Sequence, residues 1–222
     1  MERVLKSLKQ LRDGDFTMAR NKKSSEKIQK ITDISRNLFI RNGYDNTSVR
    51  DILTQAGIST GSLYNFFRNK EEILLSIYKE ILEQIDRTCE EITSGLDNPL
   101  LKFSVSIALQ SIVFMNNQSK KNIYFAAFQS RLVEEYIIEQ NHKVVRSLLE
   151  EAGLYFTARE IRIRTVALNA CVSAVLEDCL HLQPDLEDHQ IYSLLIRIGL
   201  AQFDVPDGQI DSVIRKTRQL VS

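Results

Sequence analysis

Residues that break helices are scarce in this chain, and their scarcity constrains the fold more than any other feature of the sequence. Three prolines and eight glycines occur in 222 residues, too few for the many tight turns of an all-β domain. Apolar residues recur at spacings of three and four, as in amphipathic helices. No segment alternates apolar and polar residues between turn signals, so we expect an all-α fold.

Capping residues and helix breakers predict where the helices begin and end. Ser48 with Asp51 three residues later has the spacing of a capping box, and Gly57 suits the end of the same helix. In the N-terminal part we expect a short helix ending near Asp13, then helices over 24–43, 48–57, 59–66 and 69–93. Beyond Gly95 we expect helices over 98–117, 119–151, 158–182, 186–203 and 208–220. Whether the helix over 119–151 is broken near Arg131 is left open.

The bulk composition excludes several classes of protein. No run of eighteen apolar residues and no secretory leader occur, and the cysteines (Cys89, Cys171 and Cys179) lack the spacing of a disulfide framework. We therefore expect a cytoplasmic protein. Residues 1–23 form an N-terminal extension. Because Met18 begins a natural-looking start, Met-Ala-Arg-Asn-Lys-Lys, our hypothesis is that translation begins there.

Charge is distributed unevenly along the chain, although the net charge is zero. Residues 18–70 contain ten Lys/Arg and four Asp/Glu, a net charge of +6, whereas residues 71–222 contain fifteen and twenty-two, a net charge of −7. The basic segment begins with Arg20, Lys22, Lys23 and Lys27. This asymmetry indicates that the N-terminal quarter meets a polyanion. Ordinary variation among solvated helix faces is the alternative.

The segment 47–66 has the pattern of a helix-turn-helix: a short helix, a tight turn at Gly57, and a second short helix. Ile58 and Leu63 are expected to face the core of this small domain. Such a second helix can enter the major groove of DNA. The residues left to face outward are short or polar: Thr60, Gly61, Ser62, Tyr64 and Asn65.

Residues 47–74 resemble the DNA-binding domain of the tetracycline-repressor (TetR) family, in the run T-S-V-R-D-I-L-T-Q-A-G-I-S-T-G-S-L-Y-N-F-F-R-N-K-E-E-I-L. The resemblance extends over about 26–81. It implies that Ser48, Tyr64 and Lys70 hold phosphates and that Arg50 reaches a phosphate or a guanine edge. It also implies that Thr60, Gly61 and Ser62 lie nearest the bases and that Asn65 pairs with adenine. The predicted DNA-binding residues are Ser48, Arg50, Ser59, Thr60, Gly61, Ser62, Tyr64, Asn65 and Lys70.

The same resemblance implies the role of the C-terminal region. Helices 158–182 and 186–203 are expected to pair with their copies in a homodimer, with burial inside one subunit as the alternative. The preceding aromatic-rich helices are expected to line a pocket for a small, largely apolar effector, although core packing explains the same residues equally well. The candidate pocket residues are Phe103, Ile107, Phe114, Tyr124, Phe125 and Phe128.

The predicted organisation is thus an extension (1–23), a DNA-binding domain (24–84) and an effector-binding and dimerisation domain (85–222). We predict that the protein is a transcriptional regulator that its effector releases from a palindromic operator. The family resemblance implies that it is a repressor. The alternative is a helical adaptor with a vestigial helix-turn-helix. No nucleophile–base pair, metal-ligand spacing or Gly-rich phosphate loop supports an enzyme or a cofactor. Cys171 and Cys179 share a helix face near His181, but without a C-x-x-C motif small buried residues are favoured over a metal or redox sensor.

Overall fold

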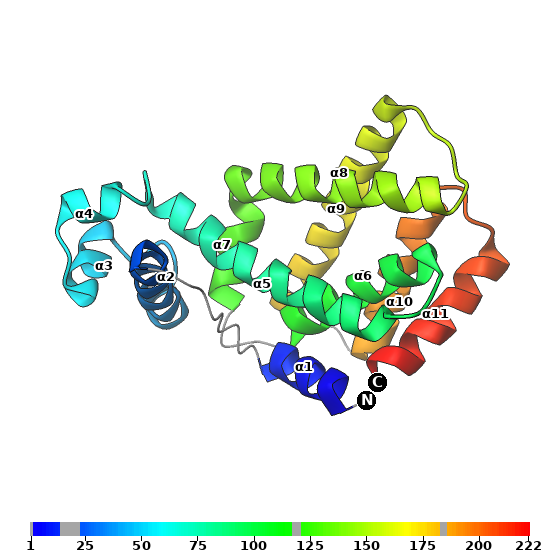
Figure 1. Ribbon diagram of the computed structural model, residues 1–222, viewed down its shortest axis with the longest axis horizontal. Helices are drawn as coiled ribbons and strands as arrows, with labels where there is room; N and C mark the ends of the chain where they lie inside the picture. The colour runs from blue at the N-terminus through cyan, green and yellow to red at the C-terminus, as the bar shows by residue number, and fades with distance from the viewer. Residues whose placement is uncertain (1, 14–22, 117–120, 183–185) are drawn as a thin grey trace. The chain divides into compact units, whose positions relative to one another are not determined.

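The computed structural model describes residues 2–13, 23–116, 121–182 and 186–222. Every regular element in these ranges is an α-helix, so the expected all-α class is confirmed (Figure 1). None of the described helices combines the length and apolar character that crossing a bilayer requires. Met18, Arg20 and Lys22 lie outside the described residues, and with them the proposed translation start and half of the predicted basic arm.

The observed helices follow the predicted order, and the break left open near Arg131 is present. There Ser130 ends one helix and its Oγ accepts a hydrogen bond from Val133 N at 3.2 Å. The helices are α1 (Glu2–Asp13), α2 (Lys23–Asn42), α3 (Val49–Ala56), α4 (Thr60–Tyr64), α5 (Lys70–Thr93), α6 (Pro99–Met115), α7 (Lys121–Gln129), α8 (Arg131–Glu151), α9 (Ala158–Leu182), α10 (Asp188–Ala201) and α11 (Asp207–Val221).

The chain divides into two compact units. Unit 1 contains Met1–Asp15, Gln84–Asn117 and Tyr136–Ser222, and unit 2 contains Phe16–Glu83 and Gln118–Glu135. α5 and α8 therefore each contribute residues to both units. The sequence-based boundary after residue 84 lies one residue from the division between Glu83 and Gln84 inside α5. It also assigned α7 to the C-terminal domain, whereas α7 packs against α2 in unit 2.

Unit 1 is built around α6, which is buried over most of its surface. Its buried residues include Phe103, Val105 and Phe114, and α1, α9, α10 and α11 all pack against it. α1 is part of this core: Leu11 is fully buried, and Arg12 Nη2 donates a hydrogen bond to the carbonyl oxygen of Val221 at 3.0 Å. The short amphipathic helix predicted near the N-terminus thus exists, and it is docked on unit 1.

Unit 2 places α2, α3, α4 and α7 around the first half of α5. The core contains Phe39, Ile52, Leu63 and Ile77, of which none is more than 2 % exposed. Ile52 and Leu63 come from α3 and α4, which have 8 and 5 residues, and a helix of fewer than about 12 residues is marginal in water without packing. Burial of their apolar faces therefore holds α3 and α4 in place.

Candidate nucleic-acid interface

The helix-turn-helix begins with a complete capping box on α3. Ser48 Oγ accepts a hydrogen bond from Asp51 N at 3.1 Å, and Asp51 Oδ2 accepts one from Ser48 N at 2.8 Å. These hydrogen bonds from Ser48, through side chain and backbone, lower the pKa of the Asp51 carboxyl. The reciprocal bonds satisfy amides that the first turn of a helix leaves free. The predicted capping box is confirmed.

Gly57 ends α3 and makes the turn. It adopts φ 65° and ψ 38° in the left-handed region, where a residue with Cβ would be strained. Its N–H donates to Leu53 O at 3.0 Å, and Lys30 Nζ from α2 donates to Ala56 O at 2.9 Å. The free carbonyls at the end of α3 are thereby satisfied. Sequence reasoning missed Lys30, because no local pattern links it to a carbonyl 26 residues later.

α4 presents one face to solvent and one to the core, as predicted. Ser59 caps it, its Oγ accepting a hydrogen bond from Ser62 N at 3.3 Å. Leu63 is 2 % exposed, whereas Tyr64 is 51 % exposed. The outward-facing residues are Thr60, Gly61, Tyr64 and Asn65, with Ser62 half-buried beside them. Their exposure meets the first requirement for contact with DNA, and Figure 1 shows α3 and α4 as neighbouring short helices ahead of α5.

Lys70 is anchored inside unit 2 by two backbone carbonyls and an aromatic ring. Its Nζ donates to Tyr44 O at 2.7 Å and to Thr47 O at 3.0 Å, and it lies 4.0 Å from the centroid of the Tyr44 ring. Partial burial lowers the pKa of Lys70, and burial raises that of Tyr44 to about 12. Lys70 therefore connects the start of α5 to the loop before α3, whatever further contact it makes. Tyr44 was not among the predicted site residues.

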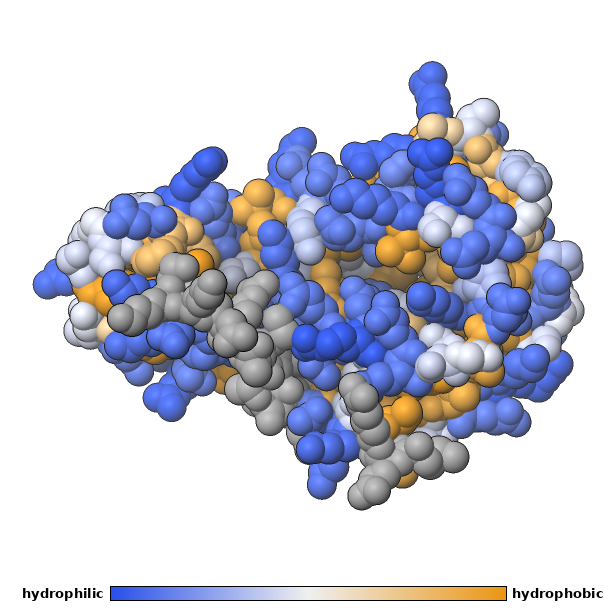
Figure 2. All heavy atoms as spheres, in the orientation of Figure 1, coloured by the Kyte–Doolittle hydropathy of each residue, from blue (hydrophilic) through white to orange (hydrophobic). Residues whose placement is uncertain are grey.

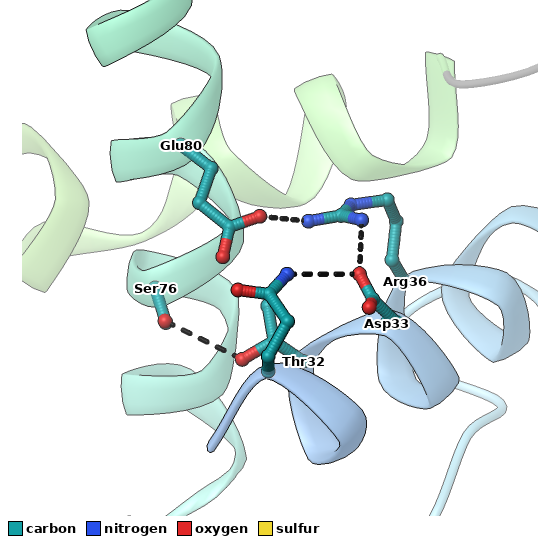
Figure 3. Close-up of polar contacts among 6 residues, drawn as sticks. Thr32, Asp33, Arg36, Ser76 and Glu80 are labelled. Atoms are coloured by element: carbon teal, nitrogen blue, oxygen red, sulfur yellow. Dashed lines mark hydrogen bonds and ion pairs between the residues drawn. The ribbon is translucent and has the colours of Figure 1, made fainter. Parts of the chain in front are cut away.

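A buried polar network joins α2 to α5 within unit 2 (Figure 3). Arg36 Nη1 donates to Asp33 Oδ1 at 2.7 Å, and Arg36 Nη2 pairs with Glu80 Oε2. Burial raises the pKa of Glu80, and the Arg36 charge opposes that rise. The Glu80 side chain is only 3 % exposed, so the two charges depend on each other. The pair orients α2 on α5 beneath the helix-turn-helix.

Exposed cations surround the helix-turn-helix. Arg50 lies on the first turn of α3 with an exposed side chain. Arg68, just before α5, has a 90 % exposed side chain and lies 3.7 Å from Glu72. A pair this exposed and this long holds the arginine weakly. Arg68 was not among the predicted contacts, although its position beside Asn69 and Lys70 follows directly from the quoted run of residues.

Unit 1 contains a cavity of about 320 Å³. Residues of α5, α6, α8 and α9 line it, among them the predicted Phe103 and Ile107. In Figure 2, hydrophobic side chains show inside a recess on the viewed face of unit 1, and hydrophilic side chains surround it. Cys89 also lines the cavity; burial raises its pKa to about 12, so it stays a thiol at neutral pH and is a poor nucleophile.

The structure does not bring the six predicted pocket residues together. Phe114 is 1 % exposed and packs in the core of unit 1 away from the cavity lining. The other three, Tyr124, Phe125 and Phe128, belong to α7 in unit 2. Of these three, Tyr124 is buried and Phe125 and Phe128 are partly buried. Among the described residues, no cluster of His, Cys, Asp and Glu is arranged to hold a metal ion.

Sequence comparisons identify relatives of the helix-turn-helix and of part of the body. Residues 31–77 match the model of the bacterial regulatory proteins, tetR family. The fatty acid metabolism regulator protein of Bacillus subtilis is 37% identical over 70 residues, which are 32% of this chain and 36% of that protein. The transcriptional repressor KstR2 of Rhodococcus jostii is 41% identical over 69 residues, which are 31% of this chain and 34% of KstR2. This chain thus matches only about a third of the length of either relative.

A longer match joins the chain to an HTH-type transcriptional regulator of Staphylococcus aureus. It is 30% identical over 128 residues, which cover 52% of this chain and 68% of that regulator. The match continues well beyond the helix-turn-helix. It therefore relates a large part of both proteins and not the DNA-binding segment alone.

Solved structures share the fold. A putative TetR-family regulator from Syntrophomonas wolfei superposes with a TM-score of 0.63 at 22% identity, covering 82% of this chain and 97% of that one. RolR in complex with resorcinol gives 0.61 at 16%, covering 86% and 93%. FadR of Bacillus subtilis in complex with stearoyl-CoA gives 0.57 at 19%, covering 78% and 98%.

Proposed function

This chain belongs to the TetR family of bacterial regulatory proteins, and from this membership we propose that it is a dimeric transcriptional repressor that a small molecule releases from its operator. The observation that carries the proposal is the outward face of α4. Thr60, Tyr64 and Asn65 are exposed there, on a helix whose other face is anchored by the buried Leu63. A rigid helix that presents polar groups to solvent has the geometry of a recognition helix in the major groove.

The capped N-termini of α3 and α4 support a role in holding the DNA backbone. Ser48 and Ser59 are exposed at these two helix starts, where their hydroxyl groups can contact a phosphate. Arg50 adds an exposed cation. In the proposal these residues position the protein on DNA, Gly61 lies close to the bases, and Thr60, Ser62 and Asn65 distinguish them.

An uncovered apolar face supports dimerisation through α9 and α10. Ile163 is 60 % exposed, Val166 39 % and Leu194 48 %. Ala167, Ala170 and Ala174 continue the exposed stripe along α9. Exposing apolar side chains at this helical spacing to water costs free energy. Contact with the same face of a second copy would remove that cost. A twofold dimer predicts a palindromic operator with half-sites about 34 Å apart, or somewhat more.

The cavity in unit 1 supports control by a ligand. α5 supplies Lys70 to the helix-turn-helix and Asp86, Cys89 and Glu90 to the cavity lining, so one continuous helix serves both. The titles of two structural neighbours record small molecules, resorcinol and stearoyl-CoA. For tenfold weaker DNA binding, the ligand must favour the released state by about 1.4 kcal/mol.

The proposal is tested by selecting DNA from a random pool with the full chain and measuring its affinity for the selected duplex. The variant carrying Tyr64→Ala and Asn65→Ala should lose at least about tenfold in affinity, since a bidentate base contact contributes about 1–3 kcal/mol. Its circular dichroism should be unchanged. Tyr155→Ala is the matched control, because Tyr155 is 86 % exposed in unit 1, far along the chain from the helix-turn-helix.

A chain that selects no DNA sequence, or a double variant that binds as tightly as the control, would contradict the proposal. Either result would favour the alternative, a helical adaptor that no longer uses its helix-turn-helix for DNA.

A further inference from the structure

An amide group in the wall of the cavity lacks the hydrogen bond that its burial requires. Asn141 on α8 and Asn169 on α9 both line the cavity, and Asn141 Nδ2 donates to Asn169 Oδ1 at 2.6 Å. Asn169 Nδ2 is shielded from solvent and has no partner in the described structure. A buried polar group without a partner costs about 1–3 kcal/mol, and native proteins rarely leave one unless a ligand or water satisfies it.

Apolar side chains form much of the rest of the inner wall, and Ser106 and Gln110 of α6 are partly buried polar residues in it. Phe103, Ile107, Val145, Leu148 and Leu168 are buried residues that line it. The volume of about 320 Å³ is at the lower end of the roughly 300–1,000 Å³ of ligand pockets. An engineered cavity of about 150 Å³ binds benzene, so this one suits a molecule of about two fused rings.

The charges at the rim disfavour an anion. Asp86, Glu90 and Glu151 are exposed acidic residues that line the cavity, and Lys102 is the basic residue among its lining side chains. The rim therefore has a net charge of −2 when these four groups are ionised. A negatively charged ligand entering this low-dielectric space meets repulsion that is stronger than in bulk water.

From these three observations we propose that the cavity takes a compact, largely apolar molecule without negative charge, toward which the Asn169 side chain turns so that the molecule accepts a hydrogen bond from Nδ2. That binding releases the operator is the part of this inference that rests on the proposed function. The site and the chemical class of its ligand rest on the cavity itself. Asn169 is then the residue that determines specificity, because a site with an unpaired buried donor discriminates against ligands that cannot satisfy it.

Three naphthalene probes of nearly equal size test the proposal with the full chain. They are 2-acetylnaphthalene, which carries a neutral acceptor, 2-ethylnaphthalene, which carries none, and 2-naphthoate, which is an anion. Equilibrium dialysis should rank the ketone about fivefold above the hydrocarbon, the effect of one net hydrogen bond. The ketone should bind about tenfold or more above the naphthoate.

Asn169→Asp is the decisive variant. It keeps an oxygen for Asn141 Nδ2 and replaces the unpaired donor by an acceptor, so the advantage of the ketone over the hydrocarbon should disappear while the fold persists. Asn37→Asp, an exposed site on α2, makes the same chemical change in unit 2 and should leave the ranking unaltered. Circular dichroism and thermal unfolding verify that both variants fold.

Several results would overturn the proposal: naphthoate binding as tightly as the ketone, no binding of any probe up to its solubility limit, or an Asn169→Asp protein that still prefers the ketone. Operator binding without probe is measured on the same preparation. Its absence would contradict the proposed function and leave the ranking of the probes intact. Failure of the ranking would leave the operator-binding result intact.

Discussion

The buried pair of Arg36 and Glu80 shows how single residues hold unit 2 together. Glu80 is 3 % exposed and Arg36 12 %, and Arg36 Nε has no partner in the described structure. The pair is therefore costly to desolvate and is compensated only while both charges are present. The ion pair orients α2 on α5. Removing one of its two partners should destabilise unit 2 through the buried charge that remains.

Glu80→Ala should accordingly lower the free energy of unfolding by up to about 3–5 kcal/mol, because it removes the buried carboxylate that pairs with Arg36 Nη2 and leaves Arg36 only the partly exposed Asp33 carboxylate. Urea unfolding monitored by circular dichroism measures the change. Glu135→Ala is the matched control in the same unit, since the pair of Arg131 and Glu135 has side chains 87 % and 58 % exposed. An exposed pair contributes about 0–1 kcal/mol. Equal effects of the two variants would show that the Arg36–Glu80 pair is not buried as described.

Among the helices, α1 is the element whose role the local sequence leaves undecided. Its amphipathic pattern permits a free helix, a docked helix or an untranslated segment. In the structure Leu11 is completely buried and Leu8 is 6 % exposed, and Ser7 Oγ donates to Glu91 Oε2 at 2.6 Å. These contacts make α1 part of unit 1. The hypothesis of a start at Met18 remains a prediction that the intact mass of the native protein tests.

Leu11→Ala should destabilise unit 1 by about 2–5 kcal/mol, because the substitution leaves a cavity in packed surroundings. The loss cannot exceed the free energy with which α1 docks on unit 1. Leu5 is 56 % exposed on the same helix, so Leu5→Ala should change stability by no more than about 0.5 kcal/mol. Denaturant unfolding measures both. Hydrogen exchange of the α1 amides should accelerate in Leu11→Ala alone, and equal exchange in the two variants would contradict docking.

The arrangement of the whole molecule depends on the exposed face of α9 and α10. In a monomer, α9 leaves the apolar side chains of Ile163 and Val166 exposed to water. In the proposed dimer this face is covered by its copy. The spacing of the two recognition helices would then be a property of the assembly and not of one chain.

Val166→Glu should therefore convert the dimer to a monomer, because two copies of the new carboxylate would be brought into an apolar contact. Sedimentation velocity measures the mass, and affinity for the selected operator should fall with it. Leu96→Glu places the same charge at a 45 % exposed apolar site between α5 and α6 and should leave the mass unchanged. A wild-type chain that sediments as a monomer at micromolar concentration would refute the dimer.

Local interactions explain why so much of the fold could be predicted. Apolar spacing, the Ser48–Asp51 box and the left-handed Gly57 act over four residues or fewer, so the sequence contains them directly. The break before Arg131 was harder to predict. It depends on Ser130, whose Oγ donates to Glu71 Oε1, 59 residues away in the sequence.

What the sequence by itself determined is the helical class, the order of the helices and the polar character of the outward face of α4, because each follows from the periodicity and capping of neighbouring residues. Only the tertiary structure decided which distant side chains meet. It joined Lys70 to the carbonyls of Tyr44 and Thr47, Arg36 to Glu80, and Asn141 to Asn169 in the cavity wall. Such pairings form when packed helices bring remote positions together, and helical spacing along one segment carries no information about them.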